Sequence, residues 1–227
     1  MGKRSLTQRQ DGRFITIEGG DGVGKTTQTT RLAMALRADG IETLTTREPG
    51  GSPGAEDIRQ LLVEGDPERW DAMTELLLLC AARRDHVQRV IAPALARGVW
   101  VVCDRFIDST TAYQGYAGGL GSETIRHLHR LALGPFRPHL TALIDLPVET
   151  RLQRRHASEP AAEQRFERFD PAFHHQVRRG FKAMARQEPQ RIVVIDGSGA
   201  EETVAAQIRA AVWERLRRPD DASPPCR

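Results

Sequence analysis

The sequence has few of the features that mark secreted, membrane-spanning or metal-cluster proteins. Only three of its 227 residues are cysteines, Cys80, Cys103 and Cys226, and no two of them form a C-x-x-C pair. This spacing argues against a disulfide framework or a paired-cysteine metal site. No apolar run is longer than Leu76–Ala82, and the mean hydropathy is −0.46. A membrane-spanning helix needs roughly 20 apolar residues, so we predict no membrane segment.

The sequence is also poor in aromatic residues and in net charge. Aromatic residues account for 5% of the chain, and 33 basic against 30 acidic side chains leave a net charge of +3. The positive excess is local, because Arg151–Arg191 contains ten basic and five acidic residues. That stretch is not interleaved with aromatic residues, which argues against nucleic-acid binding and favours contact with a small polyanion such as a nucleotide. The polar segment Met1–Asp11 lacks the apolar middle of a secretory signal, so we expect a cytoplasmic location.

The hydrophobic pattern alternates between short β-rich runs and longer segments of helical periodicity. This alternation predicts an α/β protein with a five-stranded parallel sheet flanked by helices. Pro93 predicts a kink or a break near the end of the third helix, and Gly115–Gly121 is predicted to be a loop. The predicted strands are Phe14–Glu18, Ile41–Thr46, Val99–Cys103, Leu140–Asp145 and Arg191–Asp196, and the predicted helices are Lys25–Asp39, Pro53–Glu64, Trp70–Ala96, Ser122–Leu131, Val148–Ala157, Pro171–Gln187 and Glu201–Leu216.

The chain length fits one domain with a single core. A chain of 227 residues buries roughly 70–75% of its unfolded surface, and no linker divides it into two cores. We therefore expect one domain over residues 1–227, with a mobile lid at about 150–170. The last residues, about 218–227, are expected to form a frayed tail.

A phosphate-binding loop follows the first predicted strand. Residues 19–26 read GGDGVGKT, which satisfies G-x-x-x-x-G-K-[ST] between a strand and a helix. Glycines let successive backbone N–H groups point at phosphate oxygens, and the following helix adds its positive dipole end. Lys25 is expected to reach the outer phosphates, and the Thr26 hydroxyl is expected to ligate Mg²⁺. The predicted ATP-binding residues are Gly19, Gly20, Asp21, Gly22, Val23, Gly24, Lys25, Thr26 and Thr27.

One absence narrows the class of nucleotide-binding protein. Guanine-reading switch proteins use an Asn-Lys-x-Asp element, and the sequence contains no asparagine. A GTPase of that type is therefore excluded.

Further charged residues follow the second and third strands. Arg47 ends the second strand region, and Asp104 and Arg105 follow the third. Because ligands bind at the carboxyl ends of strands in an open α/β sheet, these residues should converge beside the phosphate loop. The two guanidinium groups match phosphate oxygens bidentately, so they indicate a second anion site. Asp104, opposite Thr26, is a candidate Mg²⁺ group acting through water.

These motifs, in this order and spacing, resemble the thymidylate kinases of the bacterial type. The elements that carry the resemblance are the phosphate loop, Arg47–Gly51, the Ala-Ala-Arg of residues 81–83, the Asp-Arg-Phe of residues 104–106, and Ser109–Gln114. The match extends from about Phe14 to Val204. It implies a three-layer P-loop kinase fold, transfer of the γ-phosphoryl group of ATP to dTMP with Mg²⁺, and a homodimer built through the long helices.

The resemblance also implies roles for individual residues. Arg47 and Arg105 would hold the dTMP phosphate, Arg83 the thymine edge, and Asp21 the 3′-hydroxyl. Tyr113 would press against the sugar where a ribose 2′-hydroxyl would project. The complete expected substrate-binding set is Asp21, Arg47, Glu48, Pro49, Leu79, Arg83, Arg105, Ser109, Tyr113 and Gln114.

The sequence departs from the family pattern at three positions. Leu79 stands where the family usually has a phenylalanine that stacks on thymine, and Phe106 and Tyr113 are the candidate replacements for that surface. Gly22 stands where some members carry a catalytic arginine, which implies a lid arginine instead. Gln164 replaces an aspartate of the lid element. The expected catalytic residues are Lys25 and Arg105 together with a lid arginine, Arg165 as the first choice and Arg154 as the second.

The sequence is also compatible with two other functions. A kinase for dUMP, dCMP or thymidine would share most of these residues. A non-catalytic ATP-binding regulatory module would bind ATP without transferring phosphate to any monophosphate.

Overall fold

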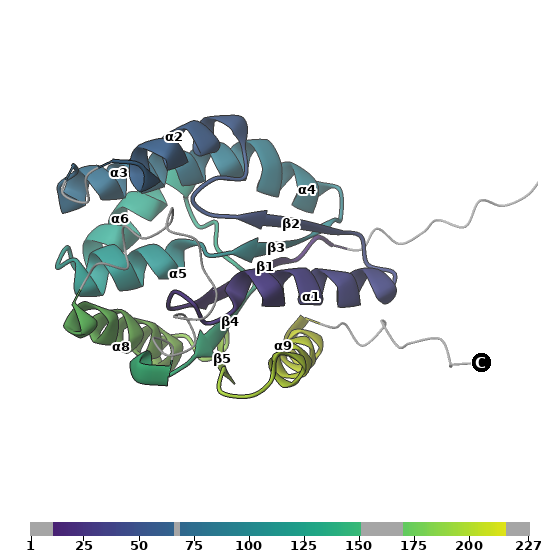
Figure 1. Ribbon diagram of the computed structural model, residues 1–227. Coiled ribbons are helices and arrows are strands. Elements are labelled where there is room, and N and C mark those ends of the chain that lie inside the picture. Colours follow the sequence, from purple (N-terminus) through teal and green to yellow (C-terminus); the bar gives the residue numbers. More distant parts are fainter. Residues whose placement is uncertain (1–10, 66–68, 151–169, 217–227) are drawn as a thin grey trace, which may run out of the picture.

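The computed structural model describes residues 11–65, 69–150 and 170–216, and its centre is a sheet of five parallel strands. The strands lie in the order β2-β3-β1-β4-β5, and every neighbouring pair is parallel (Figure 1). The five-stranded parallel sheet predicted from the sequence is thus confirmed. The strands are β1 (Phe14–Gly19), β2 (Thr43–Arg47), β3 (Trp100–Asp104), β4 (Leu140–Asp145) and β5 (Ile192–Asp196).

The register of β1, β2 and β3 gathers the carboxyl ends of these three strands at one edge of the sheet. Asp104 on β3 pairs with Ile17 on β1 and with Arg47 on β2. The loops that follow these three strands therefore begin side by side, as the motif order predicts.

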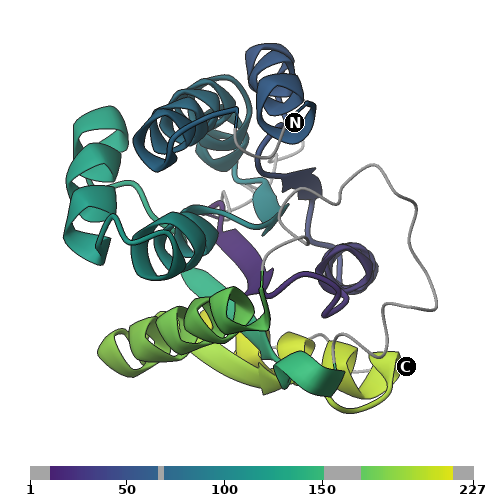
Figure 2. The ribbon, with the colours of Figure 1, turned by 60° about the vertical axis from the view of Figure 1, so that its left-hand side comes forward.

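Helices cover both faces of the sheet and form the outer two of three layers (Figure 2). On one face, Leu32 and Leu36 of α1 and Ile208 of α9 pack against β1 and β4. The other face is covered by the helical segments of residues 87–96 and 107–117, by α6 and by α8. The helical segments are α1 (Lys25–Ala38), α2 (Pro53–Val63), α3 (Ala72–His86), η1 (Val87–Ile91), α4 (Ala92–Ala96), α5 (Ile107–Thr110), η2 (Thr111–Ala117), α6 (Ser122–Leu133), α8 (Pro171–Gln187) and α9 (Glu201–Leu216).

The long third helix of the prediction is divided in the structure. The predicted span Trp70–Ala96 consists of α3, a wider π-helical turn over Val87–Ile91, and α4. Pro93 has no backbone N–H and its ring crowds the preceding turn, which accounts for the interruption just before it. The α-helix is thus interrupted just before Pro93, in agreement with the kink or break that this residue predicts.

The segment after β3 is more helical than predicted. Residues 107–117 form α5 and the π-helical segment η2, so the first part of the predicted loop Gly115–Gly121 is helix. The chain leaves the helix at Gly118, and Gly119 and Gly121 take positive φ values of 77° and 78°. The helix places Ser109, Tyr113 and Gln114 on adjacent turns, which a loop would not do.

Three other predicted features lie wholly or mostly outside the described residues. Only residues 148–150 of the predicted helix Val148–Ala157 are described, and they are helical. The predicted lid at about 150–170 and tail at about 218–227 lie almost wholly outside the described part of the chain.

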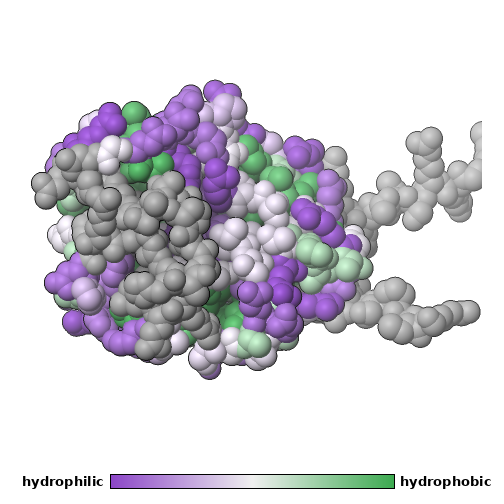
Figure 3. Space-filling model, in the orientation of Figure 1, coloured by the Kyte–Doolittle hydropathy of each residue, from purple (hydrophilic) through white to green (hydrophobic). Residues whose placement is uncertain are grey.

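The described surface is mixed in character. Hydrophilic residues, in purple, predominate on the face in Figure 3, and hydrophobic residues, in green, form small separate groups. In the parts of the chain that the structure describes, we find no helix with the length and apolar character needed to span a bilayer.

Candidate active site

The phosphate-binding loop connects β1 to α1. Gly22 and Gly24 take positive φ values of 71° and 89°, a conformation that glycine adopts without strain. Gly24 caps α1 and provides no side-chain hydrogen bond, so the first N–H groups of the helix remain available to an anion. The buried Lys25 donates from Nζ to the carbonyl oxygen of Gly20 over 2.6 Å. The loop therefore combines open amides, a helix dipole and an ammonium group.

The surroundings of Lys25 disfavour its charged ammonium form. Burial, followed by the positive charge of Arg105, lowers the pKa of Lys25 to about 8, although Asp21 and Asp104 act in the opposite direction. An anion bound at the loop would stabilise the ammonium form. The electrostatics of the loop thus favour a phosphate ligand.

A hydroxyl and a carboxylate meet beside this loop. The Thr26 hydroxyl donates to Oδ2 of Asp104 over 2.6 Å, and Oδ1 of Asp104 is buried with no hydrogen-bond partner among the described residues. Oxygen ligands of this kind, supplemented by water and phosphate oxygens, suit Mg²⁺. No group of three His, Cys, Asp or Glu side chains within the described ranges has the arrangement of an all-protein metal cage. The residues present fit a metal that arrives with a nucleotide.

Arg105 is the centre of the polar network on the acceptor side. It is the one described non-glycine residue with positive φ, at 68°, which marks a strained backbone at the end of β3. Its Nη2 forms an ion pair with Asp21, and its Nη1 donates to Ser109 Oγ over 3.0 Å. Tyr113 Oη donates to the other oxygen of Asp21 over 2.6 Å. Burial opposes the charge on Arg105, but Tyr113, Asp21 and Asp104 outweigh it and raise the pKa above its ordinary value.

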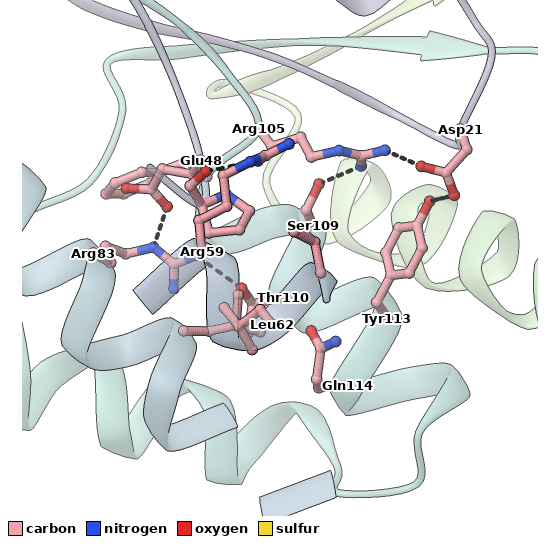
Figure 4. A pocket seen from close by; sticks show the side chains of 14 residues that line it. Asp21, Glu48, Arg59, Leu62, Arg83, Arg105, Ser109, Thr110, Tyr113 and Gln114 are labelled. Carbon is pink, nitrogen blue, oxygen red and sulfur yellow. Dashed lines mark hydrogen bonds and ion pairs between the residues drawn. The ribbon is translucent and has the colours of Figure 1, made fainter. Parts of the chain in front are cut away.

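An open cavity lies beside Arg105. Figure 4 shows Arg59, Arg105 and Asp21 along one side of it and Gln114 on the opposite side. Leu79 and two aromatic residues, Phe106 and Tyr113, supply apolar lining. Nine residues expected from the sequence to bind substrate line this cavity: Asp21, Glu48, Pro49, Leu79, Arg83, Arg105, Ser109, Tyr113 and Gln114.

The cavity wall contains one buried donor without a partner among the described residues. Arg83 is buried, and its Nε donates to Glu48 over 2.7 Å while its Nη2 donates to Thr110 over 2.8 Å. Its Nη1 is buried and has no hydrogen-bond partner within the described part of the chain. Gln114 donates from Nε2 to Glu75 over 2.8 Å, which orients its amide in the cavity wall. A ligand with an acceptor at its edge would complete the hydrogen bonding of Arg83.

Arg47, the tenth residue of that expected set, does not line the cavity. It lies at the end of β2 beside Asp104, but its side chain is 53% exposed, pairs with Glu56 and is not among the residues that line the cavity. Arg59 on α2 lines the cavity instead and donates to the carbonyl oxygen of Pro49 over 2.8 Å. The two predicted lid arginines, Arg154 and Arg165, and the lid residue Gln164 lie outside the described residues.

Comparison with known proteins accounts for this geometry. A family model described as thymidylate kinase matches residues 17–208. The chain belongs to the thymidylate kinase family. It is 51% identical over 205 residues to a thymidylate kinase of Rhizorhabdus wittichii, covering 90% of this chain and 99% of the relative. It is 52% identical over 205 residues to one of Caulobacter vibrioides, covering 90% and 98%.

A solved structure extends the similarity to the fold. The crystal structure of thymidylate kinase from Ehrlichia chaffeensis superposes with a TM-score of 0.71 at 34% identity, covering 88% of this chain and 98% of that one. The resemblance to thymidylate kinases and the P-loop kinase fold are therefore confirmed.

Two residues of this thymidylate kinase site were not predicted from the sequence. Arg59 reads as an ordinary polar position on an amphipathic helix, and only the packing of α2 against α3 turns it into the cavity. Glu18 reads as the last residue of a strand. It is buried, accepts from the Phe106 N–H over 2.7 Å and from Ser109 Oγ over 2.5 Å, and so supports the segment that carries Arg105. A charged residue within an otherwise apolar strand was the available signal for Glu18.

Proposed function

We propose that this chain transfers the γ-phosphoryl group of ATP to the phosphate of dTMP, giving dTDP and ADP. The observation that carries the proposal is a single cavity that is lined both by Arg59 and Arg105 near the phosphate loop and by Arg83, whose buried Nη1 has no partner among the described residues. A monophosphate nucleotide has the matching pattern, with an anionic end and a base edge. Family membership supports the same reaction.

The acceptor is oriented by three groups of contacts in this proposal. Arg105 and Arg59 hold the dTMP phosphate, since both line the cavity, and Arg47, exposed and paired with Glu56, remains a further candidate for this phosphate. Asp21 takes the sugar 3′-hydroxyl, and Tyr113 fills the space where a ribose 2′-hydroxyl would project. At the base, Arg83 donates to a carbonyl oxygen of thymine.

The other residues that line the cavity complete the binding site for the acceptor nucleotide. Leu79 and the ring of Phe106 pack on the base in place of the usual phenylalanine, since both line the cavity. Glu48, Pro49, Ser109 and Gln114 complete the wall.

Phosphoryl transfer needs alignment and charge stabilisation more than acid–base chemistry. The attacking oxygen belongs to a phosphate whose second pKa lies near 6, so it is already anionic at neutral pH and needs no general base. Residues Gly19–Thr27 hold the ATP phosphates through backbone amides, and Lys25 neutralises charge on the outer ones. The guanidinium group of Arg105 stabilises the acceptor side of the same transfer.

Mg²⁺ is the cofactor of this proposal. When bound with ATP, it would neutralise charge on the phosphate oxygens. Thr26 would ligate it through the side-chain hydroxyl, and Asp104 would hold it through water. The unpartnered Oδ1 of Asp104 and the Thr26–Asp104 hydrogen bond support these assignments.

A catalytic arginine completes the proposal. Gly22 provides no charge in the phosphate loop, so we assign this role to Arg165, with Arg154 as the alternative, on the resemblance of residues 164–167 to the family's lid element. A missing arginine of this kind costs about 10³–10⁵ in turnover in related phosphoryl transfers. Turnover of Arg165→Ala and Arg154→Ala, compared at saturating dTMP, decides between them.

The assembly and location are also proposals. A homodimer is supported by the exposed Leu77 on α3 and Leu131 on α6, which are 51% and 78% exposed on two helices that pack together. Light scattering of the purified chain tests this directly. The whole chain would act as one kinase domain with a lid at about 150–170, in the cytoplasm, where ATP is available.

A coupled assay with ATP, Mg²⁺ and a panel of monophosphates tests the proposed reaction. We expect dTMP to give the highest kcat/KM, and Lys25→Ala to abolish transfer without unfolding the chain. A panel in which dUMP, dCMP or thymidine exceeds dTMP would make the chain a different kinase. ATP binding without transfer to any acceptor would make it a regulatory module.

A further inference from the structure

A buried histidine lies behind the base end of the cavity. His86, the last residue of α3, is fully buried. Its Nδ1 lies 3.1 Å from Oε1 of Glu48, and its Nε2 lies 2.7 Å from the hydroxyl of Thr46. The carboxylate of Glu48 can only accept, so Nδ1 carries a hydrogen and donates it. The imidazole ring is therefore fixed between Thr46 and Glu48, the two residues that flank Arg47 at the end of β2.

Gly51 packs tightly against the imidazole ring of His86. Gly51 closes over it with φ of 87°, and a Cβ atom added there would lie 2.4 Å from Nε2 of His86 and 2.5 Å from the Thr46 hydroxyl. Only a residue without a side chain fits against the ring at that point. The loop of residues 48–51 is thus seated directly on His86.

Glu48 connects the histidine to the cavity. Its Oε1 accepts from His86, and its Oε2 accepts from Nε of Arg83 over 2.7 Å. Arg83 is further held by Thr110 at Nη2 and by the face of Phe106, whose centroid lies 5.1 Å from the guanidinium carbon. Every polar atom of this guanidinium except Nη1 has a partner, and Nη1 is the atom that remains for a ligand.

We propose that His86 is a specificity-determining positioning residue for the base of the acceptor nucleotide. It never touches the substrate. By donating to Oε1, it fixes the carboxylate plane of Glu48, and Glu48 in turn fixes the guanidinium plane of Arg83, so that Nη1 presents its hydrogen to an acceptor on the base. This inference rests on the proposed function, because it takes the ligand of Arg83 to be a pyrimidine.

The chemistry of the base edge makes this position selective. Thymine presents a carbonyl oxygen at C4, whereas cytosine presents an amino group there. A fixed donor pairs with the first and leaves two donors facing each other with the second. Because a buried donor that loses its partner is costly, a fixed donor discriminates strongly between thymine and cytosine. A donor that is free to rotate discriminates less between the two bases.

Two amide variants of His86, asparagine and glutamine, separate a positioning role from simple packing. The amide nitrogen of His86→Asn can take the place of Nδ1 and donate to Glu48. The longer His86→Gln carries its amide toward the position of Nε2 and Thr46, leaving Glu48 without this donor. His86→Leu removes both hydrogen bonds at similar size. The measurements are KM for dTMP, KM for ATP, kcat, and the ratio of kcat/KM for dTMP over dCMP.

We expect His86→Gln and His86→Leu to raise KM for dTMP about tenfold and to lower the dTMP-to-dCMP ratio about tenfold. KM for ATP should stay within about twofold, and His86→Asn should stay near the wild type in all four measurements. Equal behaviour of the Asn and Gln variants, or an unchanged ratio in His86→Gln, would overturn the inference. A wild-type chain inactive on dTMP would instead refute the proposed function.

Discussion

The hydroxyl of Thr26 donates to Oδ2 of Asp104 over 2.6 Å, although 78 positions separate the two residues in the chain. The contact exists because β1 and β3 are adjacent parallel strands, so the first turn of α1 lies beside the end of β3. Both oxygens therefore lie where a nucleotide-bound metal would approach. The parallel topology, rather than local sequence, brings the donor pair together.

Asp104→Asn should weaken the response to Mg²⁺ while leaving the fold intact. The amide keeps the size and one acceptor of the side chain but removes the negative charge that attracts the metal. We expect the Mg²⁺ concentration for half-maximal activity to rise about 10–100-fold. Asp39→Asn, at the opposite end of α1, is the matched control and should leave that concentration unchanged. An unchanged Mg²⁺ titration in Asp104→Asn would exclude Asp104 from the metal site.

Deprotonation of Lys25 should lower kcat/KM for ATP at alkaline pH. Burial lowers the pKa of Lys25 to about 8, so the free chain loses the ammonium charge as the pH rises through 8. Since ATP binding needs that charge, kcat/KM for ATP should fall about tenfold per pH unit well above pH 8.

Two variants identify the titrating group. Lys25→Arg keeps its charge and should lose the alkaline limb, even though its activity is lower. Glu18, whose pKa burial and Asp108 also raise to about 8, is the competing group. Glu18→Gln should retain the limb, and its disappearance there would assign the limb to Glu18.

The sequence predicts the sheet and the phosphate loop well because their signals are local. Strand boundaries agree within two residues, since β-rich runs end at glycine, proline or charge. The loop motif and its flanking strand and helix occupy consecutive positions. The order of the strands adds the convergence of Arg105, Asp104 and Asp21, because parallel strands share one functional edge.

The remaining features depend on contacts between distant segments. Residues 107–117 are rich in Ser, Thr and Gly, which favour loops locally, and packing against α6 and α8 makes them helical. The cavity position of Arg59 depends on the orientation of α2, and the role of His86 depends on a carboxylate 38 positions away. No periodicity in the sequence contains that information.

Arg59→Ala should affect dTMP binding more than Arg47→Ala. Arg59 lines the cavity, whereas Arg47 is 53% exposed and paired with Glu56. Loss of a charged hydrogen bond to phosphate corresponds to a rise in KM for dTMP of about 10–100-fold, and loss of the exposed pair to less than about threefold. Steady-state kinetics at saturating ATP measure both. The reverse order would mean that Arg47 enters the site when the substrate binds.

Tyr113→Ala should narrow the preference for deoxyribose. The ring lines the cavity, and its hydroxyl is held by Asp21 over 2.6 Å, so the ring is fixed beside the proposed sugar site. We expect the ratio of kcat/KM for dTMP over ribothymidine monophosphate to fall about tenfold or more. Tyr113→Phe keeps the ring and should retain most of the ratio. Equal loss in both variants would assign discrimination to the hydroxyl instead.

Glu18→Gln should change how stability depends on pH. Burial, reinforced by Asp108, raises the pKa of Glu18 from an ordinary value of 4.5 to about 8. Between these values the folded chain holds a proton that the unfolded chain releases, so this group lowers the free energy of unfolding as the pH rises from 5 to 8. The glutamine variant has no such proton. The difference in melting temperature, variant minus wild type, should therefore increase across that range, and differential scanning calorimetry measures it. Glu42→Gln, at an exposed position, should give a flat difference. A flat or falling difference for Glu18→Gln would mean that the carboxyl group is ionised in the folded chain throughout.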